Sequence, residues 1–121
     1  MRVVLCIEDE PAHLELNQIH LSRAGYSVIC ASSPKDALAT LALSTVDVIV
    51  SDQSFRCMNP GELIRQIRAL QPGVPILIYS GKPAEFARQS LPKDIAYLEK
   101  TAGAAALVSA VATLIAAPPK N

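Results

Sequence analysis

The chain has 121 residues, half of them hydrophobic, and its 11 basic and 11 acidic side chains give a formal net charge of zero. This length suits one domain with a full apolar core. The balanced charge gives no electrostatic reason to expect direct binding to nucleic acid or to an anionic membrane. The three cysteines lack a CxxC pair, so they imply neither a disulfide framework nor a zinc site.

All apolar segments are short. The run at residues 3–7 is too short for a signal peptide and is followed at once by the acidic letters EDE. No stretch reaches the roughly 20 apolar residues needed to cross a bilayer. We therefore expect a cytoplasmic protein.

Strand and helix signals alternate five times along the chain. The strand signals are runs rich in Val and Ile that mostly lack polar alternation, which is typical of strands buried on both faces of a parallel sheet. The helix signals are helical apolar spacing and capping residues. In chain order, the predicted elements are strand Val3–Ile7, helix Pro11–Ala24, strand Ser27–Ala31, helix Pro34–Leu43, strand Val46–Ser51, a helix from Pro60 to the letters QPG at residues 71–73, strand Pro75–Ser80, helix Pro83–Ser90, strand Ile95–Glu99 and helix Ala102–Ala117.

This alternation predicts the fold class. Residues 1–117 form one α/β domain, a doubly wound five-stranded parallel sheet with five helices on both faces, and residues 118–121 form a disordered tail. The stretch from Asn59 to Glu62 resembles a capping box at a helix start. In such folds, ligands bind at the carboxyl ends of the strands, so the residues that follow each strand are the functional candidates.

Polar residues follow four of the five predicted strands. Glu8 and Asp9 follow the first, Asp52 the third, Ser80 ends the fourth, and Lys100 follows the fifth. Mg²⁺ prefers oxygen ligands and is typically held by one or two carboxylates together with phosphate oxygens. A carboxylate can also accept a phosphoryl group, whose charge a lysine and a hydroxyl then stabilise. The set therefore indicates Mg²⁺-assisted phosphoryl transfer.

Each of these residues also has a simpler interpretation when taken alone. Acidic residues favour the first turn of a helix because of the helix dipole. A serine before Gly81 is common in turns, and a lone lysine is usually solvated. The functional hypothesis rests on all of these residues occurring together at strand ends.

The sequence resembles the receiver domain of two-component response regulators. The resemblance is carried by the segments VVLCIEDEP, AGYSVICASSPKDALATL, VDVIVSD, PILIYSG and AYLEK, which together extend over nearly the whole chain. It implies the flavodoxin-like strand order 2-1-3-4-5. It also implies a signalling switch in which an aspartate takes a phosphoryl group, with Mg²⁺, from a histidine kinase or phosphotransfer protein.

The resemblance assigns the acceptor and the metal ligands. Asp52 resembles the phospho-acceptor, and Glu8 and Asp9 resemble the acidic metal pair, with Asp9 as the direct ligand. The backbone carbonyl of Ser54 resembles a further metal ligand. Such a protein is not an enzyme in the ordinary sense, because it catalyses only its own phosphorylation and dephosphorylation.

The resemblance also assigns the switch residues. Ser80 resembles the hydroxyl that follows the phosphoryl group on activation, and Lys100 resembles the lysine of the family's site. Tyr97 resembles the aromatic residue whose rotamer is coupled to that hydroxyl. The downstream partner is a protein that the sequence does not identify.

Several positions depart from the family pattern. Arg56 stands where a proline is usual, and Pro60 and Gly61 stand where the loop usually has its glycine. Thr101 follows Lys100 in place of a proline that commonly has a cis peptide bond. We therefore expect either a trans bond with a shifted lysine or a strained bond, because a non-proline cis bond costs about 2.5–4 kcal/mol.

These departures keep other function classes open. A pseudo-receiver would act as an interaction module that takes no phosphate, which fits Arg56 and Thr101 but not the complete set of polar residues at the strand ends. A flavodoxin-like cofactor binder is disfavoured, because the turn after the first strand is anionic where a phosphate-binding loop needs glycines and amides.

Two helices carry unusual side chains. His13, Asn17 and His20 recur at helical spacing where an apolar stripe is expected, and we interpret them as half-buried, hydrogen-bonded side chains rather than a metal or pH-sensing site. No charged residue occurs between Thr101 and Pro119. The last helix should bury Leu107, Val108, Val111, Leu114 and Ile115, and expose Ala102, Ala106, Ser109, Thr113 and Ala116. This neutral face predicts a homodimer or a partner contact, with a plain alanine-rich surface helix as the alternative.

Overall fold

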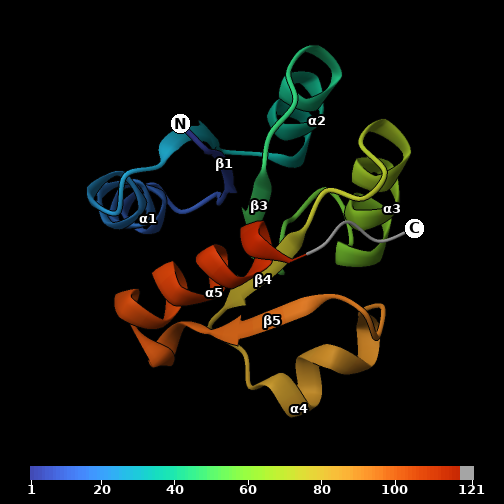
Figure 1. Ribbon diagram of the computed structural model, residues 1–121. Helices are drawn as coiled ribbons and strands as arrows, with labels where there is room; N and C mark the ends of the chain where they lie inside the picture. The colour runs from blue at the N-terminus through green and yellow to red at the C-terminus, as the bar shows by residue number, and fades with distance from the viewer. Residues whose placement is uncertain (118–121) are drawn as a thin grey trace.

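The computed structural model describes residues 1–117 and contains one parallel sheet in the order β2-β1-β3-β4-β5 (Figure 1). The predicted tail at residues 118–121 lies outside the described residues. The strands span β1 Val3–Ile7, β2 Ser27–Ala31, β3 Val48–Ser51, β4 Ile76–Ser80 and β5 Ala96–Glu99. The fold class and the strand order are therefore confirmed.

The first four helices connect successive strands, α5 follows β5, and the helices cover both faces of the sheet. They span α1 Pro11–Arg23, α2 Pro34–Leu43, α3 Pro60–Leu70, α4 Ala84–Ala87 and α5 Ala104–Ala116, with 3₁₀ turns η1 at Arg88–Ser90 and η2 at Lys100–Ala102. In the part of the chain that the structure describes, no helix is both long and apolar enough to cross a membrane.

Alternate side chains of the strands build two separate cores, because successive residues of a strand point to opposite faces. On one face, Ile49 and Ile78 pack with buried residues of α2 and α3. On the other, Val50 and Leu77 pack with α1 and α5, whose buried Leu107 is 0% exposed. Burying both faces explains why the strand sequences are almost continuously apolar.

The boundaries differ from prediction where local geometry intervenes. The predicted helix Pro83–Ser90 is helical over only four residues before it tightens into η1. The predicted last helix is divided by Gly103, whose φ of 91° lies in the left-handed region that glycine tolerates. The chain therefore makes the turn η2 after β5 and begins α5 two residues later than predicted.

The start of α3 is capped, but not as a capping box. The Asn59 side chain accepts a hydrogen bond of 2.8 Å from the Glu62 backbone N–H. The Glu62 carboxylate instead binds the side chains of Arg65 and Gln66. The hydrogen bond from Arg65 lowers the pKa of Glu62 to about 2. The reciprocal half of the predicted box is therefore absent.

The predicted buried stripe of α5 is confirmed: Leu107 and Val111 are buried, and Val108, Leu114 and Ile115 are half-buried against the same core. The predicted outer face needs one correction. Ser109, Thr113 and Ala116 are exposed as expected, but Ala106 is half-buried because it lies nearer the flank of the helix. The exposed alanines include Ala102, Ala105 and Ala112.

Candidate functional site

The carboxyl ends of β1 and β3 meet because the two strands are paired in parallel. Ile7 lies opposite Ser51 in the ladder. The pairing continues past the strands, since the Asp52 backbone N–H donates a 3.0 Å hydrogen bond to the Ile7 carbonyl. Glu8 and Asp52 are each the next residue after this last pair, so the two carboxylates are brought to the same edge of the sheet.

Three carboxylates gather there. Oxygens of Glu8, Asp9 and Asp52 lie within 4.8 Å of one another. Glu8 is 1% exposed, whereas Asp52 is half-buried and Asp9 is exposed. Burial raises the pKa of Glu8; a hydrogen bond from Lys100 opposes the rise, and the nearby Asp52 adds to it. Such crowding of carboxylate oxygens is relieved by a hard divalent cation, so this donor set fits Mg²⁺.

Lys100 reaches this cluster from the end of β5. Its Nζ donates to Glu8 Oε1 at 2.7 Å and lies 4.0 Å from Asp52 Oδ2. The Lys100–Thr101 peptide bond is trans, as are the other peptide bonds among the described residues. The trans bond is one of the two predicted alternatives, and with it the ammonium still lies within the acidic cluster.

His13 on α1 joins the same group. Its Nδ1 lies 3.1 Å from Glu8 Oε1 and 3.2 Å from Lys100 Nζ. One ring nitrogen either donates to Glu8 or accepts from Lys100, because it carries a proton or a lone pair. Of the three residues predicted to be half-buried, only His20 is; Asn17 is buried and His13 is exposed. The helical spacing marked His13 as unusual without indicating this contact.

Ser80 and Tyr97 lie at the carboxyl ends of β4 and β5. Ser80 is buried, and its Oγ accepts a 3.2 Å hydrogen bond from the Lys82 backbone N–H. The Tyr97 hydroxyl donates to the Lys82 carbonyl at 2.7 Å. Both side chains therefore contact the backbone of Lys82. This shared contact is a physical connection between the predicted switch residues in the resting protein.

The loop after β3 carries Ser54 and Arg56, both exposed. Within this loop, Phe55 and Met58 form an isolated antiparallel bridge. Together with Lys82, these loop residues line a shallow pocket of about 510 Å³. Ser54 follows Asp52 by two residues in the chain, and the role of its backbone carbonyl stays a prediction.

Sequence reasoning did not identify Gln53, which is 3% exposed. Its backbone N–H donates to Asp52 Oδ1 at 2.8 Å, and its side chain accepts from the Tyr97 hydroxyl at 3.3 Å. The available signal was strand alternation: continued past β3, it places residue 53 on the same face as Ile49 and Ser51. A glutamine is unexpected on that buried face.

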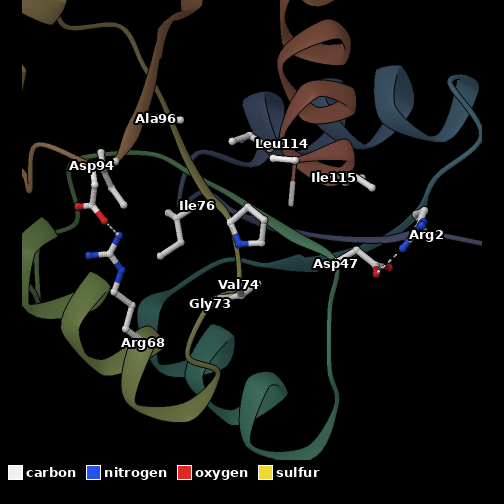
Figure 2. A pocket seen from close by; sticks show the side chains of 13 residues that line it. Arg2, Asp47, Arg68, Gly73, Val74, Ile76, Asp94, Ala96, Leu114 and Ile115 are labelled. Carbon is white, nitrogen blue, oxygen red and sulfur yellow. Dashed lines mark hydrogen bonds and ion pairs between the residues drawn. The ribbon is translucent and has the colours of Figure 1, made fainter. Parts of the chain in front are cut away.

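The opposite, amino end of the sheet has a cavity of about 480 Å³ (Figure 2). Its floor includes Ile76 and Leu114, and the ion pairs Arg2–Asp47 and Arg68–Asp94 lie at its rim. This cavity has none of the acidic cluster's residues. Among the described residues, the group of carboxylates that could hold a metal ion lies at the carboxyl end.

A five-stranded parallel sheet of order 2-1-3-4-5 defines a protein of the flavodoxin-like class, with its polar site at the carboxyl edge. The particular family follows from the sequence, because the family described as "Response regulator receiver domain" matches residues 4–112. The chain therefore belongs to the receiver domains of response regulators, which are signalling switches of two-component systems.

Individual relatives agree with this assignment. The chain is 34% identical over 83 residues, 69% of its length, to the alkaline phosphatase synthesis transcriptional regulatory protein PhoP of Bacillus subtilis, of which it covers 35%. It is 35% identical over 75 residues, 62% of its length, to the transcriptional regulatory protein GlrR of Escherichia coli, of which it covers 17%. The chain thus spans only a minor part of these curated relatives.

Solved structures match over the whole fold. A response regulator receiver protein from Sinorhizobium medicae is 30% identical, with a TM-score of 0.83 over 96% of this chain and 95% of that one. The response regulator TrrA from Thermotoga maritima, solved in complex with Mg²⁺-BeF, is 20% identical with a TM-score of 0.80 over 94% of this chain and 99% of that one. At that identity, TrrA supports the fold alone.

Proposed function

We propose that Asp52 accepts a phosphoryl group from a histidine kinase or phosphotransfer protein and that Mg²⁺ is bound by Glu8, Asp9, Asp52 and the Ser54 carbonyl. One observation carries the proposal. Three carboxylates with oxygens within 4.8 Å of one another share the carboxyl edge with the Lys100 ammonium, 2.7 Å from Glu8. Membership of the receiver-domain family gives the proposal further support.

The Asp52 carboxylate is oriented for this chemistry. The Gln53 backbone N–H binds Oδ1, which leaves Oδ2 facing Lys100 at 4.0 Å. In the proposed step, a carboxylate oxygen of Asp52 bonds to phosphorus while the phosphorus–nitrogen bond of the donor histidine breaks, and the leaving imidazole takes the electron pair. Bound Mg²⁺ would neutralise the charge on the phosphoryl oxygens.

Lys100 and Ser80 stabilise the product in this proposal. Lys100 now binds Glu8 and would turn its ammonium toward a phosphoryl oxygen on Asp52, since charge-assisted hydrogen bonds to phosphate are strong. The Ser80 hydroxyl, now bound by the Lys82 N–H, would then donate to another phosphoryl oxygen. Tyr97, hydrogen-bonded to the Lys82 carbonyl, would follow this rearrangement. The protein would act only on its own acceptor.

The test is the intact mass of the protein after incubation with acetyl phosphate, with and without Mg²⁺. We expect an added phosphoryl group only with Mg²⁺, its loss in Asp52→Asn, and its retention in the control Asp47→Asn at the opposite end of the sheet. An unmodified wild type under every donor and metal condition would instead support the pseudo-receiver alternative, which the departures at Arg56 and Thr101 favour.

We also propose that the exposed face of α5 forms a homodimer or binds a downstream protein. Ala105, Ser109 and Ala112 are exposed on a helix without charged residues, so another backbone could approach closely. Ala112→Glu should weaken association, as measured by light scattering over a concentration series. Ala39→Glu, at an exposed position of α2, should not. A wild type that stays monomeric with and without a phosphoryl mimic rules out the dimer.

Cytoplasmic location and the absence of direct nucleic-acid binding belong to the same proposal. The net charge of zero supports the second point. The curated relatives are transcriptional regulatory proteins, but this chain matches only 17–35% of their length. Any contact with DNA by a protein carrying this domain would then come from another part of that protein.

A further inference from the structure

Gln53 is a polar side chain buried between the acceptor and the fourth helix, with a relative exposure of 3%. Its Nε2 donates to the Ala87 carbonyl at 3.2 Å and lies 3.5 Å from Ser90 Oγ. Its Oε1 lies 3.3 Å from the Tyr97 hydroxyl. One amide group therefore contacts α4, the turn η1 and β5.

The orientation of this amide is determined by chemistry. A carbonyl oxygen can only accept, so the Ala87 carbonyl requires the NH₂ group of Gln53 on its side. The Gln53 carbonyl then has to face Tyr97. The Tyr97 hydroxyl has a single proton, which the nearer Lys82 carbonyl, at 2.7 Å, and Gln53 Oε1 both compete for. The position of Gln53 therefore influences which partner Tyr97 uses.

The contact with Ala87 also supports α4. This helix has only four residues, too few to be stable on its own. The backbone N–H of its C-cap residue, Arg88, donates to the carbonyls of Ala84 and Phe86. The Ala87 carbonyl accepts hydrogen bonds from Gln53 Nε2 at 3.2 Å and from Ser90 Oγ at 3.2 Å. A residue outside the helix thus closes its carboxyl end.

The backbone of the same residue holds the acceptor, since the Gln53 N–H donates to Asp52 Oδ1 at 2.8 Å. A change at the Asp52 carboxylate therefore acts directly on the peptide unit from which the Gln53 side chain extends. A buried polar group that is left without a hydrogen-bond partner destabilises the folded protein. Gln53, Tyr97 and the Ala87 carbonyl are thus expected to exchange partners together rather than one at a time.

We propose that Gln53 is a positioning residue that sets the resting position of Tyr97 and of residues 84–90, and that transmits a change at Asp52 to both. The first part concerns the resting protein and is independent of phosphate. The second part rests on the proposed function.

The resting protein is tested with two variants. Gln53→Met keeps the length of the side chain but removes its hydrogen bonds to Ala87, Ser90 and Tyr97. Gln53→Glu keeps the acceptor toward Tyr97 but removes the donor toward Ala87. Fluorotyrosine labelling gives one ¹⁹F resonance for each of Tyr26, Tyr79 and Tyr97. Hydrogen exchange reports on residues 84–90, with α3 as the internal reference.

In Gln53→Met, we expect the Tyr97 resonance to shift, with Tyr26 and Tyr79 unchanged. Exchange at residues 84–90 should rise about tenfold, corresponding to the loss of about one buried hydrogen bond. In Gln53→Glu, exchange should rise likewise while Tyr97 shifts less. If Tyr97 and residues 84–90 behave as in the wild type in both variants, the proposal is wrong. A uniform rise in exchange that includes α3 would also overturn it, because it would show a purely structural role.

The second part is tested with beryllofluoride and Mg²⁺. The wild-type Tyr97 resonance should move on addition, and this response should be reduced severalfold in Gln53→Met. An equal response in the two proteins would overturn the transmission role. A wild type that does not respond would contradict the proposed function instead, while the measurements on the resting protein would still decide the first part.

Discussion

The charged side chains at the two ends of the sheet differ in how they are paired and in how far they are exposed to solvent. At the carboxyl end, Lys100, Glu8 and His13 share partners within a cluster where Glu8 is buried. At the amino end, Arg2–Asp47 and Arg68–Asp94 are separate ion pairs, partly exposed beside the cavity that they help to line. The charges at the carboxyl end therefore share partners around one buried carboxylate, whereas those at the amino end form separate pairs that are partly exposed.

This difference follows from the direction of the strands. In a parallel sheet, every strand delivers its next residue to the same edge, so the residues after β1, β3, β4 and β5 converge there. The amino edge instead receives chain that returns from the helices, such as residues 73–75 after α3. The carboxyl end is therefore expected to supply chemistry, and the amino end to contribute stability through apolar contacts.

The largest expected effect compares the two ends of α5. Leu107 lies in the first turn of α5, the end of the helix toward the carboxyl edge of the sheet. Leu107→Ala removes a side chain that is 0% exposed and should reduce the free energy of unfolding by about 2–5 kcal/mol. Leu114→Ala, at the amino-end cavity, should cost roughly half as much, because Leu114 is half-buried and already borders open space. Denaturant unfolding measures both.

Exposed Ser109 gives the control for this pair. Ser109→Ala should change the free energy of unfolding by no more than about 0.5 kcal/mol. Equal losses for Leu107→Ala and Leu114→Ala would mean that the cavity is filled in solution and that the two ends are packed alike.

The next effect is stabilisation by Mg²⁺. At a concentration one hundred times the dissociation constant, a bound ion raises the free energy of unfolding by about 2.7 kcal/mol. Asp9→Asn should abolish most of this gain, because it removes a carboxylate of the cluster. Asp47→Asn, at the amino end, should retain it. Thermal unfolding with Mg²⁺ and with EDTA provides the measurement.

The comparison would fail if the Asp9 and Asp47 variants lost the Mg²⁺ gain equally. Glu8→Gln gives a finer division in the same experiment. We expect it to weaken Mg²⁺ binding less than Asp9→Asn, because Asp9 is the proposed direct ligand.

Much of the carboxyl end was predictable because strand direction alone brings its residues together. The apolar runs predict the sheet, and the residues that follow those runs include Glu8, Asp52 and Lys100. These predictions depend on chain order and on the ligand preferences of Mg²⁺, not on side-chain geometry. Family resemblance then supplied individual roles for Tyr97 and Ser54.

The remaining contacts depend on how helices are placed against the sheet. His13 meets Lys100 across 87 residues of sequence, and Gln53 meets Ala87 across 34. Neither contact can be read from a local sequence pattern, because both depend on how helices and strands pack against one another. The break at Gly103 and the shortened α4 are similar: helical spacing favoured longer helices, and backbone geometry ended them.

A smaller effect tests the coupling at Glu8. Its raised pKa means that the folded protein holds this proton more tightly than the unfolded chain. The stability linked to Glu8 should therefore fall as pH rises from its ordinary pKa of 4.5 through the raised value. In EDTA, Glu8→Gln should remove this decline, so that the variant matches or exceeds the wild type in melting temperature at pH 7. A variant that is less stable at every pH would show that the ion pair between Glu8 and Lys100 stabilises the fold by more than the burial of the Glu8 charge destabilises it.

The smallest effect is expected for an ion pair at the amino end. Arg68 Nη2 lies 2.8 Å from Asp94 Oδ2, but the side chains are 37% and 49% exposed, so water and salt screen the attraction. Such pairs contribute about 0–1 kcal/mol. Because Asp94 makes a further interaction, the pair is best isolated by a double-mutant cycle of Arg68→Gln and Asp94→Asn. The coupling energy should stay below about 1 kcal/mol and shrink between low and high salt. A larger, salt-insensitive coupling would place a desolvated pair at the amino end, and the contrast in charge between the two ends of the sheet would then no longer hold.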